Sequence, residues 1–203
     1  MLIAGDLFDS AHVTKRTQNT VKETILRYPA MDFLYLKGNH DTETFLDAWE
    51  ERPENLKTFG TEWTYYRYDN VVIAGAEFAG DNGPVLYDSL VLNREDCNIV
   101  MLHGQTEKYR SKEKAEMVSL GALKNKNIDY LALGHIHSYR CEPLDARGVY
   151  CYCGCPEGRG FDECGEKGFV LLEVSGGKIH SSFIPFASRR LHEIDVDITG
   201  AET

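Results

Sequence analysis

The chain has 203 residues, of which 42% are hydrophobic and 27% charged, and its formal net charge is −10 at pH 7. This length is enough for one domain with a sizeable core, and the composition is ordinary for a soluble globular protein. No apolar stretch approaches the roughly 18 residues that a helix needs to span a bilayer, which excludes a helical membrane span in this sequence. The acidic charge is unusual for a protein that binds nucleic acid through Lys and Arg, but divalent ions would attract phosphate locally. The charge can equally serve solubility alone, so it carries no inference about DNA.

Apolar periodicity and turn residues predict an α/β fold, with strands and helices alternating in the first half of the chain and antiparallel strands in the second. We expect strands at residues 1–5, 32–37, 56–59, 63–68, 71–78, 98–102, 128–133, 148–153, 168–174 and 178–184. We expect helices at residues 14–28, 43–50 and 112–124. Residues 80–84 are expected to form a loop, Gly176 and Gly177 the turn of a hairpin, and residues 192–199 the start of a further strand. This order fits two sheets packed face to face with helices outside.

Four short polar blocks each follow one of these apolar runs. They are Gly5-Asp6-Leu7-Phe8-Asp9, Gly38-Asn39-His40-Asp41, Leu102-His103-Gly104 and Gly134-His135-Ile136-His137. In α/β folds, ligands gather beyond the carboxyl ends of the strands, so side chains from all four blocks can meet at one rim. Carboxylate, amide oxygen and imidazole groups suit Mn²⁺, Fe²⁺ or Zn²⁺. The sequence therefore predicts a metal site at this rim.

The order and placement of these blocks resemble the calcineurin-like metallophosphoesterases, whose pattern is G-D-x-x-D, G-N-H-D, H-G and G-H-x-H. Within that family, the stretches at residues 5–10, 132–138 and 152–169 look like the SbcD-type DNA repair exonuclease branch. The resemblance implies a four-layer sandwich of two mixed β-sheets flanked by helices. The family's D-x-H block, which precedes G-D-x-x-D, is absent. We therefore expect a phosphoesterase domain at residues 1–190 that lacks its first strand, and the start of a linker or capping region at residues 191–203.

The resemblance also assigns roles to the residues of the four blocks. Asp6, Asn39, His103 and His135 are the expected ligands of one divalent ion. Asp6 and His137 are expected to hold a second ion, whose site is incomplete here because an Asp and a His are absent. A carboxylate can bridge two cations, which suits Asp6. The implied cofactors are two divalent ions, Mn²⁺ first, with Fe²⁺ and Zn²⁺ as alternatives.

His40 and Asp41 are the candidate catalytic residues. By resemblance, the imidazole of His40 donates a proton to the leaving oxygen or stabilises charge on the phosphoryl group, and histidine titrates near neutrality as this requires. Asp41 either fixes the tautomer of His40 or caps the helix expected at residues 43–50. Asp9 is expected to support the ligands without contacting the metal.

The implied function is that of a cytoplasmic nuclease core, which hydrolyses the phosphodiesters of DNA with a metal-activated hydroxide. The implied partner is an SbcC-like ATPase, and a homodimer is also open. One alternative is a phosphodiesterase for small molecules such as cyclic nucleotides. Another is a binding fragment whose catalysis is impaired because the D-x-H block is absent.

Six cysteines, at positions 97, 141, 151, 153, 155 and 164, leave two interpretations open. Cys151, Cys153 and Cys155 alternate along an expected strand and would face one side, where Cys141 or Cys164 could complete a zinc or redox cluster. Their spacing is not the C-x₂-C pair of common zinc sites. The interpretation we favour is that they are small buried residues in a reducing cytoplasm.

Overall fold

The computed structural model describes residues 1–8, 12–41, 44–47, 49–112, 115–161, 163–197 and 199. The helices are α1 (Lys15–Arg27), α2 (Thr44–Asp47), α3 (Gly83–Ser89) and α4 (Leu120–Leu123). The strands are β1 (Leu2–Ala4), β2 (Phe33–Leu36), β3 (Leu56–Thr58), β4 (Thr64–Tyr68), β5 (Val71–Gly75), β6 (Cys97–His103), β7 (Tyr130–Gly134), β8 (Arg140–Pro143), β9 (Val149–Tyr152), β10 (Gly168–Ser175) and β11 (Lys178–Pro185). Within this part of the chain, no helix is both long and apolar enough to cross a bilayer.

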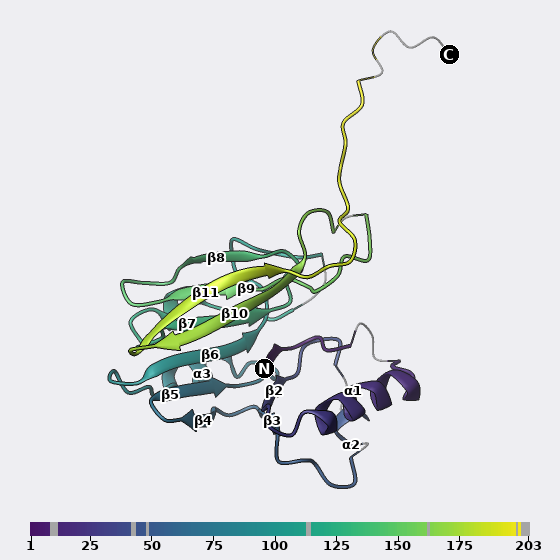
Figure 1. Cartoon of the computed structure of the whole chain (residues 1–203). Helices are drawn as coiled ribbons and strands as arrows, with labels where there is room; N and C mark the ends of the chain where they lie inside the picture. Colours follow the sequence, from purple (N-terminus) through teal and green to yellow (C-terminus); the bar gives the residue numbers. More distant parts are fainter. Residues whose placement is uncertain are drawn as a thin grey trace.

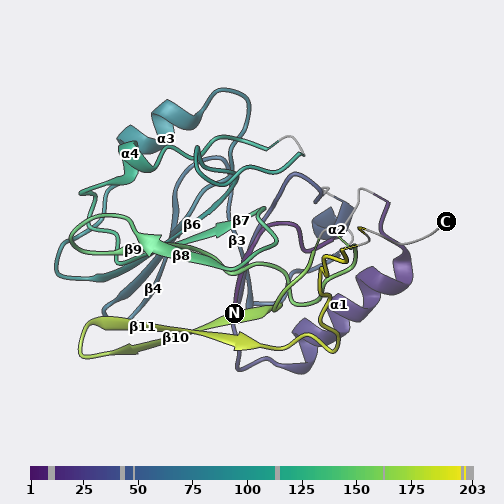
Figure 2. The same ribbon diagram turned by 90° about the horizontal axis from the view of Figure 1, so that it is seen from above.

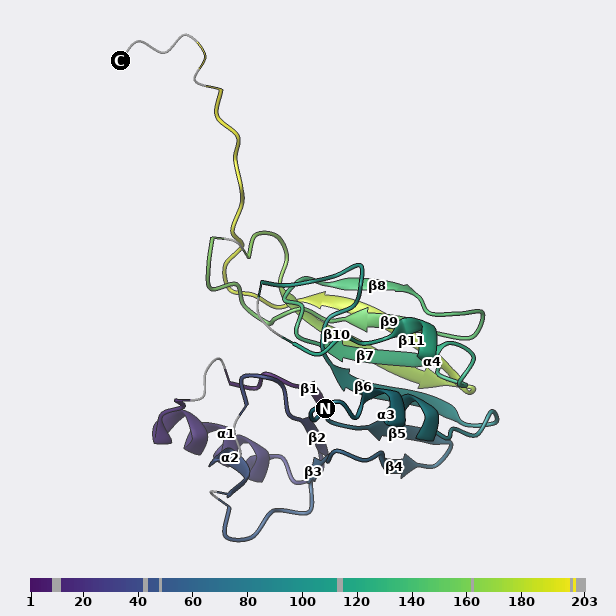
Figure 3. The same cartoon turned by 180° about the vertical axis from the view of Figure 1, so that it is seen from behind.

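The strands form three hydrogen-bonded sheets in two layers (Figure 1). One layer is a six-stranded mixed sheet in the order β4-β5-β6-β7-β9-β8. The other contains the parallel sheet β1-β2-β3 and the separate hairpin β10-β11. The expected mixed α/β fold is confirmed, but its second layer consists of two pieces. Both pieces pack on the same face of the six-stranded sheet, as the views in Figures 2 and 3 show.

Two layers of strands and an outer layer of helices on each side make four layers. Successive residues of a strand point to opposite faces, so the central strands can pack against the other β-layer on one face and against helices on the other. Between the two β-layers lie Leu34, Leu36, Ile99 and Met101. The neighbouring residues of the same strands point the other way, toward the helices. Phe33 and Tyr35 pack with α1 and α2, and Val100 and Leu102 pack with α3 and α4. Each fully buried side chain of this kind stabilises the fold by about 1.5–3 kcal/mol.

Several expected elements are confirmed with small changes at their ends. Helix α1 begins after Thr14, whose Oγ1 accepts a hydrogen bond from the Thr17 amide at 3.2 Å, and it ends shortly before Pro29. The hairpin turns at Gly176 and Gly177, whose φ angles of 58° and 72° are unfavourable for other residues. Its strands pack against the core between the layers.

The helix expected at residues 112–124 is wrong, since among its described residues, 112 and 115–124, only Leu120–Leu123 is helical. Extended backbone pairing replaces its middle part. Gln105 N donates to Glu116 O at 2.9 Å, and Val118 N donates to Gln105 O at 2.8 Å. Tertiary hydrogen bonds thus override the local helical preference.

Three further differences concern the remaining segments. The loop expected at residues 80–84 instead leads into α3, which begins with Gly83-Pro84, and proline is well tolerated in a first helical turn. Strand β8 was not expected. The strand expected at residues 192–199 does not form over its described residues, 192–197 and 199, and this yellow segment leaves the body of the molecule in Figure 1.

The two layers lie close together at Gly134, the last residue of β7. A Cβ at this position would lie 1.6 Å from the carbonyl oxygen of Ala4 in β1. We expect Gly134→Ala to force the layers apart and to lower the free energy of unfolding by about 1–3 kcal/mol or more. Chemical denaturation measures this loss. The control is Gly121→Ala in α4, where the added methyl group meets nothing closer than 4.0 Å and stability should not fall.

Glu142 of β8 joins a loop to the six-stranded sheet through its carboxylate. It accepts hydrogen bonds from Lys108 and Tyr109, and from Tyr150 Oη at 2.6 Å. The hydrogen bonds from Lys108, Tyr109 and Tyr150 lower the pKa of Glu142 to about 2.

A depressed carboxyl pKa stabilises the fold above the unfolded-state value of about 4.3, and this contribution is lost as the pH falls toward 2. Glu142→Gln should therefore be less stable than the unmodified chain at pH 7, and the difference should shrink as the pH falls from 5 toward 2. Denaturant titrations over this range provide the measurement, with the exposed Glu193→Gln as control. A difference that stays constant with pH would contradict this role of the Glu142 charge.

Candidate metal centre

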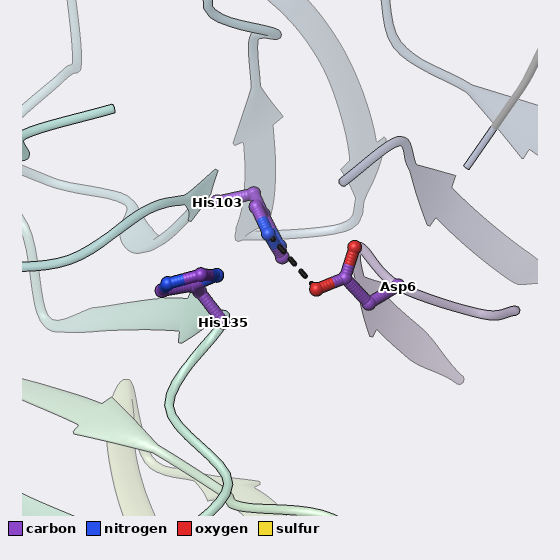
Figure 4. A group of neighbouring side chains, drawn as sticks. All are labelled: Asp6, His103 and His135. Atoms are coloured by element: carbon purple, nitrogen blue, oxygen red, sulfur yellow. Dashed lines mark ion pairs between the residues drawn. The ribbon is translucent and has the colours of Figure 1, made fainter. Parts of the chain in front are cut away.

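The candidate residues lie where four parallel strand ends meet at one rim. Strand β1 pairs in parallel with β2 in one layer, and β6 pairs in parallel with β7 in the other. Asp6 follows β1 and Asn39 follows β2, whereas His103 ends β6 and His135 follows β7. Figure 4 shows Asp6, His103 and His135 turned toward one another across the space between the layers.

Local backbone geometry aims two of these side chains at the centre. Asp6 has a φ of 52° and His135 a φ of 95°, values that residues other than glycine adopt rarely. The chain also leaves room for the carboxylate of Asp6, because a Cβ at Gly38 would lie 2.2 Å from Asp6 Oδ1. The positive φ of Asp6 and the absence of a Cβ atom at Gly38 therefore both allow the carboxylate of Asp6 to reach this position.

Four potential ligand atoms converge in this arrangement. Asn39 Oδ1 lies 2.9 Å from His103 Nε2 and 3.0 Å from His135 Nδ1. His103 Nε2 in turn lies 3.2 Å from Asp6 Oδ2. Both rings are buried, with exposed fractions of 7% for His103 and 6% for His135.

Hydrogen bonding around His103 bears on whether these residues fit a metal ion. His103 Nδ1 lies 2.8 Å from the carbonyl oxygen of Ala4, which can only accept, so a neutral ring that binds a cation through Nε2 would carry its proton on Nδ1. Its Nε2 lone pair then faces the oxygens of Asp6 and Asn39. Asp6 Oδ2 is buried, and no residue in the described part of the chain donates a hydrogen bond to it. A divalent cation would satisfy all of these lone pairs, so the residues present fit a metal ion.

The carboxylate of Asp6 is held in its charged form. Burial raises its pKa, but the charge and hydrogen bond of His103 when that ring is protonated, together with the amide of His40, outweigh this effect, and the net pKa lies below its ordinary value. His40 N donates to Asp6 Oδ1 at 3.0 Å. Asp6 can therefore act as an anionic ligand at neutral pH.

Asp41 contacts the backbone of both loops that carry the ligands. Its carboxylate accepts hydrogen bonds from Gly38 N at 3.0 Å, Phe8 N at 3.1 Å and Leu7 N at 3.3 Å. Burial raises the pKa of this carboxyl despite these bonds. Asp41 thus joins the loop after β1 to the loop after β2, and the expected action on His40 stays a prediction. Asp9, expected to support the ligands, lies outside the described residues.

His137 lies in a different group from the other ligands. Its Nδ1 is 2.5 Å from Glu163 Oε1, and potential ligand atoms of His137, Cys155 and Glu163 lie within 4.8 Å of one another. Sequence reasoning gave no role to Glu163, although it lies in the stretch at residues 152–169 that carries the branch resemblance. It also missed Ser111, whose Oγ lies 2.7 Å from His135 Nε2 and for which no sequence signal exists.

The cysteines occupy several environments. Cys141 of β8 lies directly opposite Cys151 of β9, and Cys151 is buried between the layers. A hydrogen bond from Cys151 is the main cause that lowers the pKa of Cys141 to about 7. Among the described residues, Cys155 is the one cysteine that joins a group of three potential metal ligands, so these residues form no metal cluster centred on Cys151 and Cys153.

A cavity of about 360 Å³ opens beside the metal centre. Its wall includes Asn39, Asp41 and His103 from the centre, together with Lys37 and Glu77, which pair at 3.1 Å. The cavity gives a small ligand access to the ligand atoms from solvent.

Comparisons with known proteins place the chain among its relatives. Residues 1–139 match the model of the calcineurin-like phosphoesterase family. The uncharacterized metallophosphoesterase YhaO of Bacillus subtilis (strain 168) is 26% identical over the whole chain, which spans 52% of its length. The SbcD subunit of the nuclease SbcCD from Escherichia coli (strain K12) is 44% identical over 54 residues, which are 26% of this chain and 13% of that protein.

A solved structure supports the fold. The crystal structure of TT1561 of Thermus thermophilus superposes with a TM-score of 0.52 at 11% identity, over 90% of this chain and 84% of that one. At this identity the likeness concerns the fold alone. Since the family match covers more than half of the sequence, the chain belongs to the calcineurin-like phosphoesterases, a family that indicates metal-dependent hydrolysis of phosphoesters.

Proposed function

We propose that this chain is the metal-binding core of a nuclease that hydrolyses phosphodiester bonds of DNA. The observation that carries the proposal is the convergence of potential ligand atoms from Asp6, Asn39, His103 and His135, with both imidazole rings buried, beside an open cavity. Divalent ions at such a centre supply an activated water molecule and neutralise charge on the phosphate. The four residues would hold one ion, and Asp6 and His137 would contribute to a second.

The side chains next to the ligands supply the remaining chemistry. We assign to His40 the proton that the leaving oxygen takes up, because it follows the ligand Asn39 and its backbone is fixed by Asp6. Asp41 would keep the two ligand loops in register through its three backbone hydrogen bonds. The nitrogen and oxygen ligand set favours Mn²⁺, with Fe²⁺ and Zn²⁺ as alternatives.

DNA is the proposed substrate because of the similarity to the SbcD subunit of the nuclease SbcCD and the motif resemblance over residues 152–169. That relative is named as one subunit of a nuclease, which supports a partner subunit, and we propose that this partner is an ATPase of the SbcC type and that both act in the cytoplasm. A net charge of −10 leaves the metal ions as the main attraction for phosphate. A second candidate function, hydrolysis of small diesters such as cyclic nucleotides, is compatible with the same centre.

The test compares substrates under defined metal conditions. The protein is stripped with a chelator, reloaded with Mn²⁺, Fe²⁺ or Zn²⁺, and assayed on end-labelled DNA, on 2′,3′-cyclic AMP and on bis(p-nitrophenyl) phosphate. We expect Mn²⁺-dependent cleavage of DNA and of the synthetic diester, and none in His103→Ala. Cleavage of cyclic nucleotides without cleavage of DNA would favour the second candidate. Metal binding without any hydrolysis would instead indicate a binding role.

A further inference from the structure

Glu163 contacts the ring of His137 at its Nδ1 atom. Glu163 Oε1 lies 2.5 Å from His137 Nδ1. An ionised carboxylate can only accept a hydrogen bond, so the proton of the neutral imidazole is on Nδ1 and the Nε2 lone pair is left for a cation. The two residues come from different segments, which follow β7 and β9 respectively.

The carboxylate of Glu163 is itself fixed in place. Its Oε2 accepts a hydrogen bond from Arg159 N at 2.6 Å, and Glu163 N donates to Gly160 O at 3.0 Å. Only 12% of the Glu163 side chain is exposed. Because the carboxylate of Glu163 is fixed by these contacts, it restricts the rotation of the His137 ring.

Residues of the same segment also hold the backbone of His137. The buried Lys167 donates from Nζ to His137 O at 2.7 Å, and Cys155 Sγ lies 3.6 Å from the same oxygen. The ammonium group of Lys167 also interacts with the thiol of Cys155. A positive charge beside Cys155 disfavours a cation bound at that thiol.

The other two histidines of the centre have comparable partners on the ring nitrogen that faces away from Asn39. His103 Nδ1 is held by Ala4 O, and His135 Nε2 by Ser111 Oγ. Metal-binding histidines commonly have such a partner, which fixes both the tautomer and the orientation of the ring. The carboxylate of Glu163 gives His137 the same arrangement.

We infer that Glu163 is a positioning residue, which fixes the tautomer and orientation of His137 for binding a divalent ion. This inference rests on the proposed function, because it requires that the centre binds metal. It adds a residue from the segment between β9 and β10 to a centre otherwise built from four strand ends.

The first measurement is Mn²⁺ affinity, by competition with a fluorescent chelator, for the unmodified chain and for Glu163→Ala, Glu163→Gln and His137→Ala. Loss of such a partner costs about 10–100-fold in metal affinity, which we expect for Glu163→Ala. Glu163→Gln keeps the shape and an acceptor oxygen and should lose less. The matched control is Glu157→Gln in the same segment, whose carboxylate binds Ser188 and Arg189. Its affinity should be unchanged.

The second measurement is the tautomer of His137 in the metal-free protein, from long-range ¹H–¹⁵N spectra of the imidazole. We expect the Nδ1–H form in the unmodified chain and a mixture in Glu163→Ala. Equal Mn²⁺ affinity in the unmodified chain, Glu163→Ala and His137→Ala would overturn the inference, as would an Nε2–H form in the unmodified chain. Failure of the unmodified chain to bind Mn²⁺ would instead overturn the proposed function.

Discussion

Replacing His103 by alanine should weaken the binding of divalent metal by more than about 100-fold, because partners that merely orient a ligand already contribute about 10–100-fold. The substitution deletes a nitrogen that lies within 3.2 Å of both Asn39 Oδ1 and Asp6 Oδ2. Asn39→Ala should have a similar effect, since it removes the oxygen between the two buried rings. Chelator competition with Mn²⁺, and metal analysis after dialysis, would measure both losses.

The control for this prediction is His180→Ala, which removes an exposed imidazole from β11. Its metal affinity should equal that of the unmodified chain. Because both His103→Ala and Asn39→Ala also change packing at the rim, their thermal stability in the absence of metal should be compared with that of the unmodified chain. Retention of tight metal binding by His103→Ala would show that the converging atoms are not the ligands.

Replacing His40 by alanine should reduce turnover by about 10²–10⁴-fold while leaving the metal content unchanged, because general acid catalysis contributes a factor of this size. His40 follows the proposed ligand Asn39, and its backbone amide donates a hydrogen bond to Asp6 that alanine retains. The rate at saturating Mn²⁺ and the metal content of the same sample are the two measurements.

Comparing two substrates distinguishes the two possible roles of His40, proton donor to the leaving oxygen or stabiliser of charge on the phosphoryl group. A p-nitrophenolate leaving group needs little protonation, whereas the sugar alkoxide of DNA needs a proton as it departs. The loss in His40→Ala should therefore be much larger on DNA than on bis(p-nitrophenyl) phosphate. Equal losses on both substrates would point to stabilisation of charge on the phosphoryl group. If His40→Ala loses metal as completely as His103→Ala, His40 belongs among the ligands.

The sequence by itself determined the strands that end at the rim and the polar blocks that follow them. Short apolar runs such as Phe33–Leu36 and Cys97–His103 specify buried strands through local composition, and parallel strands bring their carboxyl ends to one edge. The neighbourhood of Asp6, Asn39, His103 and His135 follows from these two facts. The helix cap at Thr14 and the double-glycine turn of the hairpin could also be predicted from the sequence, because both depend on a few adjacent residues.

Only the tertiary structure decided which distant segments support these elements. Gln105 pairs with the strand-like backbone at residues 116–118 and prevents a helix there, and Asp41 bonds to the amides of Leu7 and Phe8. Glu163 reaches His137 across 26 positions of sequence. Such contacts depend on how strands and loops pack, and no periodicity or spacing along the chain encodes them. For the same physical reason, the ligand blocks could be recognised in the sequence but the groups that orient them could not.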